Sequence, residues 1–141
     1  MIATKLFLLP AFIHVAMIFV LVVKLGRGRV EAARRGKVQL RDIALDSSKW
    51  PGEIRKIGNA YGNQFELPVL YYAALALLLA TGLVDWVAVG LSWAFVAARL
   101  VHVAIHTGDN VVIRRFQAFV AGVLVLALLW LWFALRLFVT G

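Results

Sequence analysis

The stretch LFLLPAFIHVAMIFVLVV, residues 6–23, decides the fold class, because it is a continuous apolar run without a charged residue. A membrane-spanning helix needs about 20 predominantly apolar residues. Basic residues begin directly after the run, at Lys24 and Arg27, and no small-residue cleavage pattern separates them from it. Such residues hinder translocation of the chain that follows, so the run is not typical of a cleaved signal peptide. We predict a retained transmembrane helix.

The composition of the whole chain also points to a bilayer environment. The 141 residues are 63% hydrophobic, with a mean hydropathy of +0.89, whereas a soluble domain is about half apolar. A soluble chain of this length has too little interior to bury the excess. The sequence contains no cysteine, which excludes disulfides, cysteine nucleophiles and Cys-ligated metals. We therefore expect a single integral membrane domain over residues 1–141.

Three further segments have the length and apolarity of membrane spans. The four predicted helices cover approximately residues 5–25, 51–82, 86–107 and 111–139. Pro51 suits the first turn of the second helix, where its missing N–H would be unpaired in any case. Pro68 lies inside that helix and removes a backbone hydrogen bond, so we expect a kink there. The predicted fold class is all-α, a membrane four-helix bundle with left-handed up-down topology and both termini on one side.

The basic residues are distributed unequally between the two sides of the membrane. Residues 24–56 carry ten Lys or Arg against four Asp or Glu, and the turn over 107–115 adds Arg114 and Arg115. Short basic loops face the cytoplasm, so we expect this side to be cytoplasmic in a bacterial inner membrane or its equivalent, with both termini opposite. A basic loop beside a membrane favours an anionic lipid surface or an acidic small ligand. No recognisable nucleic-acid module is present.

Polar residues recur on one face of the second predicted helix. Asn59, Asn63 and Glu66 follow the i, i+4, i+7 spacing of neighbours on a 3.6-residue helix. Lys56 lies one turn before them on the same face. An ionisable group inside a span costs about 2.5–3.5 kcal/mol or more, and such groups usually face the bundle interior with a partner. We therefore expect this face to point into the bundle.

The third predicted helix carries a matching face, formed by Arg99, His102 and His106 at i, i+3 and i+7. At about 1.5 Å per residue, Glu66 and Arg99 lie at similar depths, in the half of the membrane nearer the basic loop. We predict an ion pair between them. The asparagines and histidines would line the space from that pair to the membrane surface, and one of the arginines at 114–115 would close it.

Each of these features also has a structural explanation. Glu66 with Arg99 fits a polar clasp between helices, and the asparagines fit interhelical hydrogen bonding. The i, i+4 spacing of His102 and His106 matches a helical metal pair, but it also fits hydrogen-bonded polar lining. We prefer polar lining and predict no metal site. His14, on the first helix, is expected to be packed or to reach toward the membrane surface.

The segment EIRKIGNAYGNQFELP, residues 53–68, resembles the second helix of the MAPEG superfamily, the membrane-associated proteins in eicosanoid and glutathione metabolism. The family pattern there is an asparagine, a glutamate three residues later and a proline soon after, here Asn63, Glu66 and the proline at the end of the segment. AFVAARLVHVAIHTG, residues 94–108, is similar to the third helix of the family, whose arginine would be Arg99.

The resemblance implies a membrane-bound, glutathione-dependent transferase or peroxidase that acts on lipophilic electrophiles, with glutathione as co-substrate. It also implies a homotrimer with ligand sites between subunits, and lipids and lipophilic small molecules as partners. Catalysis would fall to an arginine that activates the thiol, for which Arg114 and Arg115 are the candidates. The residues expected to hold glutathione are Lys56, Asn59, Asn63, Glu66, Arg99, His102 and His106.

The sequence departs from the family pattern at two positions. Asn59 takes the place of an arginine that contacts the carboxylates of glutathione, unless Arg55 or Lys56 supplies that contact from one turn earlier. Leu67 takes the place of a tyrosine that follows the glutamate in several members. These departures leave a second possibility open, a non-catalytic member of the fold that binds a lipid or a partner protein.

Overall fold

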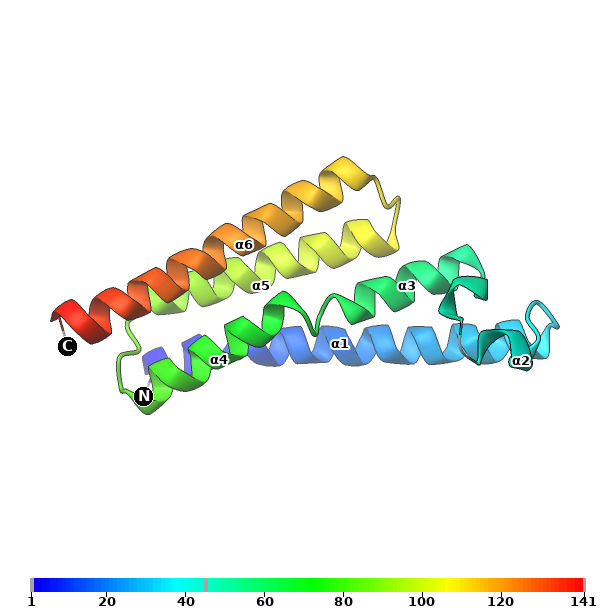
Figure 1. Ribbon diagram of the computed structural model, residues 1–141. Helices are drawn as coiled ribbons and strands as arrows, with labels where there is room; N and C mark the ends of the chain where they lie inside the picture. Colours follow the sequence, from blue (N-terminus) through cyan, green and yellow to red (C-terminus); the bar gives the residue numbers. More distant parts are fainter. Residues whose placement is uncertain (1, 45, 141) are drawn as a thin grey trace.

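A computed structural model describes residues 2–44 and 46–140 of the protein, without the side chain of Thr140. Over these residues the protein consists of helices and turns and has no strand. Figure 1 shows the long helices side by side, with the start of α1 and the end of α6 at one end of the bundle and α2 at the other. The elements in chain order are α1 (Ile2–Arg34), α2 (Leu40–Ile43), η1 (Ser47–Lys49), α3 (Gly52–Gly62), α4 (Leu67–Ala80), α5 (Trp86–Thr107), α6 (Val112–Leu135) and the π-helical turn η2 (Arg136–Thr140).

Within the described part of the chain, four helical segments are long and apolar enough to cross a membrane. They are Ile2–Arg34, Gly52–Ala80, Trp86–Thr107 and Val112–Val139. Their outward surfaces carry large apolar side chains, since Phe12, Phe19, Leu124 and Leu131 are each more than half exposed. An outer surface of this kind suits lipid rather than water. The predicted all-α membrane bundle of four spanning helices is confirmed.

The first helix is longer than the sequence suggests. α1 has 33 residues, or about 50 Å at 1.5 Å per residue, whereas the hydrocarbon core of a bilayer is about 30 Å thick. Its last turns therefore project beyond the membrane, where Leu25 and Ala32 pack with Ile54 of α3 in a small apolar cluster. The expected end near residue 25 marks the end of the apolar run, but charged residues such as Glu31 do not end a helix.

The second span is interrupted rather than kinked at Pro68. α3 ends at Gly62 and α4 begins at Leu67, with residues 63–66 in a non-helical turn. Pro68 lies in the first turn of α4, the one place in a helix where a missing N–H breaks no hydrogen bond. The chain thus accommodates the proline by ending one helix and starting another, with the interruption at residues 63–66 just before the expected kink.

The main apolar core lies toward the end of the bundle that holds the start of α1 and the end of α6. Its fully buried members include Phe7, Tyr71, Leu78, Phe95 and Leu129. Tyr71 stacks on Phe95 with ring centroids 4.5 Å apart, and its hydroxyl lies 2.8 Å from Ser92 Oγ. Ser92 in turn donates to the Phe7 carbonyl at 3.0 Å. Residues of α1, α4, α5 and α6 therefore meet in one packed unit.

Asp85 ties the same end together through its carboxylate. Oδ1 accepts from the Ala88 N–H at 2.9 Å and so caps the N-terminus of α5. Trp132 Nε1 lies 3.1 Å from both carboxylate oxygens, and Arg136 Nε lies 3.6 Å from Oδ2. One side chain thereby joins the start of α5 to the end of α6.

Candidate ligand site

Arg99, only 1% exposed on α5, is hydrogen-bonded to the interruption of the second span. Its Nη2 donates to the Asn63 carbonyl at 3.0 Å and to Gln64 Oε1 at 3.1 Å. A carbonyl at the end of a helix has lost its intrahelical donor, and a guanidinium, which stays charged and carries five donors, can replace it. Arg99 therefore holds the interruption in place.

The predicted ion pair between Glu66 and Arg99 is wrong. Over the residues described, no carboxylate lies within ion-pair distance of Arg99, and Glu66 is exposed whereas the guanidinium is buried. The helical spacing that suggested the pair ends at the interruption, because the backbone of Glu66 is non-helical, with φ −94° and ψ −101°. The two polar faces meet instead at Asn63, whose carbonyl accepts from Arg99 and whose side-chain amide lies beside His106.

Sequence reasoning missed Gln64, which is the centre of a buried polar network. Its Nε2 donates to the Ala60 carbonyl at 2.6 Å, which leaves Oε1 as the acceptor for Arg99 and for His14 Nε2 at 3.2 Å. His14 is fully buried, and its Nδ1 lies 2.6 Å from the Tyr72 hydroxyl. With Nε2–H donating to Gln64, Nδ1 accepts from Tyr72. One feature of the sequence could have identified Gln64: it is a glutamine inside an apolar span, four residues before Pro68, whose missing N–H leaves the Gln64 carbonyl without a helical partner.

Beside this network lies an open cavity of about 380 Å³, bounded by α3, the interruption, the end of α5 and the start of α6. Five of the residues that line it were singled out from the sequence, namely Asn59, Asn63, Glu66, His106 and Arg115. Gly58 and Gly62 supply the remaining wall, and a Cβ on Gly62 would have no atom within 4 Å. The cavity is therefore polar and roomy, and we call it the polar cavity.

The two histidines of α5 occupy different positions around the polar cavity. His106 lines it, and its Nδ1 lies 3.4 Å from Asn63 Nδ2. His102 lies deeper, 5.6 Å from His106 between ring centroids, and its buried Nδ1 has no hydrogen-bond partner among the residues described. Across residues 2–44 and 46–140, no group of three His, Cys, Asp or Glu side chains is arranged to hold a metal ion.

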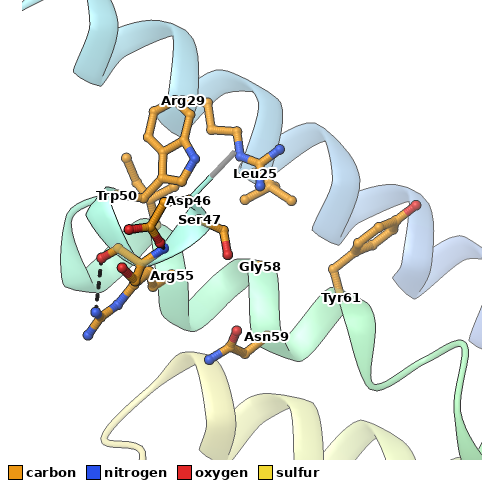
Figure 2. A pocket seen from close by; sticks show the side chains of 11 residues that line it. Leu25, Arg29, Asp46, Ser47, Trp50, Arg55, Gly58, Asn59 and Tyr61 are labelled. Carbon is orange, nitrogen blue, oxygen red and sulfur yellow. Dashed lines mark hydrogen bonds between the residues drawn. The ribbon is translucent and has the colours of Figure 1, made fainter. Parts of the chain in front are cut away.

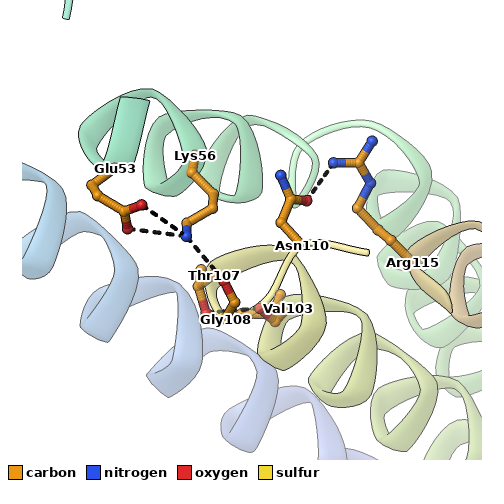
Figure 3. Close-up of polar contacts among 7 residues, drawn as sticks. All are labelled: Glu53, Lys56, Val103, Thr107, Gly108, Asn110 and Arg115. Carbon is orange, nitrogen blue, oxygen red and sulfur yellow. Dashed lines mark hydrogen bonds and ion pairs between the residues drawn. The ribbon is translucent and has the colours of Figure 1, made fainter. Parts of the chain in front are cut away.

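The structure separates the two candidate arginines of α6. Arg115 lines the polar cavity, and its Nη1 donates to Asn110 Oδ1 at 2.6 Å (Figure 3). Arg114 is exposed and lies 3.4 Å from Asp109 Oδ2. Asn110 adopts φ +53°, a left-handed conformation that asparagine tolerates better than most residues. The turn before α6 thus supports Arg115 beside the polar cavity and leaves Arg114 outside it.

A smaller cavity of about 200 Å³ adjoins the polar cavity and is more apolar. Asn63 and Arg115 line both cavities, whereas the smaller one adds His102 and the α6 side chains Val112, Phe116 and Phe119. Val112 and Phe116 are each more than half exposed on the outside of the bundle. We call this space the apolar cavity; it connects the position of Arg115 with the lipid-facing surface of α6.

Neither basic residue that precedes Asn59 lines the polar cavity. Lys56 Nζ lies 3.0 Å from Glu53 Oε2 and donates to the Gly108 carbonyl at 2.9 Å, at the end of α5 (Figure 3). Arg55 Nη1 donates to the Ser48 carbonyl at 3.1 Å, on another side of α3. Arg55 and Lys56, the two possible substitutes for an arginine at position 59, are therefore absent from the lining of the polar cavity.

Comparisons with known proteins support one assignment. No curated protein and no solved structure matches the chain. A protein-family comparison does match, over residues 7–135, which include α2 to α6 and all but the first turn of α1. This range also contains each residue that lines the two cavities. The chain is therefore a member of the MAPEG family, the superfamily of membrane proteins in eicosanoid and glutathione metabolism.

Proposed function

We propose that the protein is a glutathione-dependent transferase or peroxidase that acts on lipophilic electrophiles dissolved in the bilayer. The observation that carries the proposal is the polar cavity, which is lined by residues of membrane-spanning helices and exposes Glu66 and Asn59. Contact of such groups with lipid costs several kcal/mol. A polar ligand covered by a second copy of the chain removes this cost, as in the homotrimer that family membership suggests.

Glutathione matches the polar cavity in size and in part of its charge. The volume of about 380 Å³ lies within the range of about 300–1,000 Å³ that small ligands occupy. The tripeptide carries an ammonium, two carboxylates and a thiol. Glu66 is suited to the ammonium, the amides of Asn59 and Asn63 to the peptide groups, and Arg115 to the thiolate. With Asn59 in place of the family arginine, the two carboxylates require cations from the neighbouring subunit.

Arg115 is the residue that we assign to activation of the thiol. A nearby guanidinium favours the thiolate and lowers the thiol pKa from about 8.5. The thiolate sulfur would form the new bond to the electrophilic carbon, while the leaving group departs with its electron pair and the thiol proton is released to solvent. With a hydroperoxide, the thiolate would cleave the O–O bond, and a second glutathione would convert the resulting sulfenic acid to the disulfide and water. The apolar cavity, which also contacts Arg115, would admit the second substrate from the membrane along Phe116 and Phe119. His102, His106 and Arg99 would support these walls rather than touch the thiol.

The test compares Arg115→Gln with Arg114→Gln, a matched change one residue away on the exposed side of α6. In purified protein, ultraviolet absorbance of the thiolate during a pH titration reports the thiol pKa of bound glutathione. We expect a lowered thiol pKa and conjugation of a generic aromatic electrophile in the wild type and in Arg114→Gln. Arg115→Gln should lose both. An unshifted thiol pKa together with no conjugation in the wild type would end the proposal.

A second candidate function is favoured by Asn59, which stands where the family pattern has a cationic arginine. In that case the protein is a non-catalytic MAPEG member whose cavity binds a lipid or a partner protein. Thermal unfolding distinguishes the two candidates, since stabilisation by lipids without stabilisation by glutathione supports the second one.

We further propose that the loop end of the bundle faces the cytoplasm. The support is the excess of basic residues over 24–56 and at the start of α6, which short loops retain on the cytoplasmic side. Accessibility of single cysteines to a membrane-impermeant reagent in intact cells tests this orientation, because the chain has no cysteine of its own. A cysteine at Lys37 should be protected, whereas one near the start of α1 should react.

A further inference from the structure

A separate cavity of about 500 Å³ lies at the loop end of the bundle, between the last turns of α1, residues 46–50 and the first turns of α3. Figure 2 shows its side chains, with Arg29 extending from α1, Trp50 from the loop and Tyr61 from α3. Gly58 and Asn59 contact both this cavity and the polar cavity. Arg29, Trp50 and Arg55 belong to this one alone, which we call the loop cavity.

The loop cavity lies at the level of the lipid headgroups. The apolar run of α1, residues 6–23, extends for about 27 Å at 1.5 Å per residue and so nearly fills the hydrocarbon core of about 30 Å. Leu25 and Arg29 follow within the next turns, and both line the cavity. Trp50 also suits this level, because tryptophan prefers the membrane interface.

The cationic side chains of the loop cavity are available to an anion. Arg29 lies over the ring of Trp50, with Cζ 5.3 Å from the ring centroid, and Arg55 donates to a backbone carbonyl. Among the residues described, neither arginine forms an ion pair. The one acid of the lining, Asp46, accepts from the Ser48 N–H at 2.8 Å. The lining therefore holds two guanidiniums and one carboxylate, which already accepts a hydrogen bond.

The loop-cavity lining also contains apolar side chains. Leu25 and Ile54 are both less than 10% exposed, and Trp50 and Tyr61 pack against them. Toward the membrane centre, Val15 and Val22 continue this side of α1 and are exposed. A free anion would leave the apolar side chains unused, whereas an amphiphile with a phosphate at one end would contact both the arginines and the apolar side chains.

We propose that the loop cavity binds the phosphate headgroup of an anionic glycerophospholipid. Arg29 and Arg55 would hold the phosphate, since guanidinium–phosphate contacts are strong and directional. The hydroxyls of Ser47 and Ser48 would contact the headgroup, and the acyl chains would descend past Leu25 along α1. This lipid site is distinct from the glutathione site proposed above and does not depend on it.

Native mass spectrometry of the detergent-purified protein, titrated with single lipids, tests the proposal. We expect phosphatidylglycerol to bind at least about tenfold more tightly than phosphatidylcholine, whose choline offsets the phosphate charge. The variant Arg29→Gln/Arg55→Gln should lose about tenfold in phosphatidylglycerol affinity, because each cation near the phosphate contributes to binding. The matched control is Arg27→Gln/Arg34→Gln, which removes the same charge from α1 outside the cavity and should change affinity less than twofold.

Competition with small anions identifies the source of the phosphate, and single variants keep the test decisive if the double variant misfolds. Millimolar inorganic phosphate or glutathione should leave phosphatidylglycerol binding unchanged, and displacement by inorganic phosphate would mean that the site takes free phosphate instead. Equal losses in the two double variants, or no loss in either, would overturn the proposal. If Arg29→Gln/Arg55→Gln does not fold, the single changes replace it, each with an expected loss of about threefold.

Discussion

Replacement of Arg99 by methionine tests whether the hydrogen bonds of the guanidinium stabilise the interrupted span by more than the burial of its charge costs. Arg99 makes two hydrogen bonds to the interruption, to the Asn63 carbonyl and Gln64 Oε1. Hydrogen bonds from a charged group contribute about 1.5–3 kcal/mol each, and a buried carbonyl left unpaired costs about 1–3 kcal/mol. Against this, the buried charge has no counter-ion in the described part of the chain, and its desolvation costs several kcal/mol. We expect Arg99→Met to lower the free energy of unfolding by about 2–3 kcal/mol.

The assay is reversible unfolding in mixed detergent micelles, followed by far-ultraviolet circular dichroism. A double-mutant cycle with Gln64→Leu should give a coupling energy of about 1–2 kcal/mol, because the two side chains share a hydrogen bond. Arg114→Met, an exposed arginine-to-methionine change, should stay within about 0.5 kcal/mol of the wild type. If Arg99→Met is as stable as the wild type or more so, the cost of burying the charge exceeds the benefit of its bonds, and the assigned role is wrong.

Three further predictions concern the two ends of the bundle. Asp85→Ala removes the cap of α5 and should lower the free energy of unfolding by about 1–2 kcal/mol, whereas Asp85→Asn, which keeps a capping oxygen, should cost less in the same unfolding assay. The Glu31–Arg35 ion pair is short at 2.6 Å, but both side chains are more than 60% exposed, so Glu31→Ala should change that free energy by less than about 0.5 kcal/mol. Hydrogen bonding from Ser48 lowers the pKa of the Asp46 carboxyl below its usual 3.8. The ionised carboxylate should therefore stabilise the fold above pH 3.8, and this stabilisation should be lost as the pH falls through the lower pKa of the folded state. Carboxyl chemical shifts of Asp46 during an acid titration check this, and a midpoint at or above 3.8 would contradict it.

The spanning topology could be predicted because it depends on apolar length and on the positions of charges. The third helix, expected over 86–107, corresponds to α5 at Trp86–Thr107. The C-terminal end of the first helix was harder to predict, because hydropathy marks where the chain leaves the membrane and not where the helix ends. Charged residues such as Glu31 and Arg34 can continue a helix in water. α1 consequently runs to Arg34, about nine residues beyond its expected end.

The candidate site could be predicted only in part, because helical spacing assumes an uninterrupted helix. Asn59 and Asn63, on α3 and at its end, do line one cavity as their spacing suggests. Glu66, beyond the interruption, joins them at the cavity but does not reach Arg99. Gln64 was overlooked because a glutamine carries no charge, although its amide can both donate and accept, as the network around it requires.

The position of the main core has a consequence for how members of this fold can diverge. The residues that pack α1, α4, α5 and α6 together, such as Phe7 and Leu129, are gathered at one end, together with the Asp85 carboxylate. The polar, apolar and loop cavities are lined by a different set of residues toward the opposite end. A substitution that alters which molecule is accepted therefore need not disturb the packing on which folding depends. Ligand preference and stability can be selected almost independently in this architecture, and one scaffold can serve many chemistries by exchanging residues at a single end.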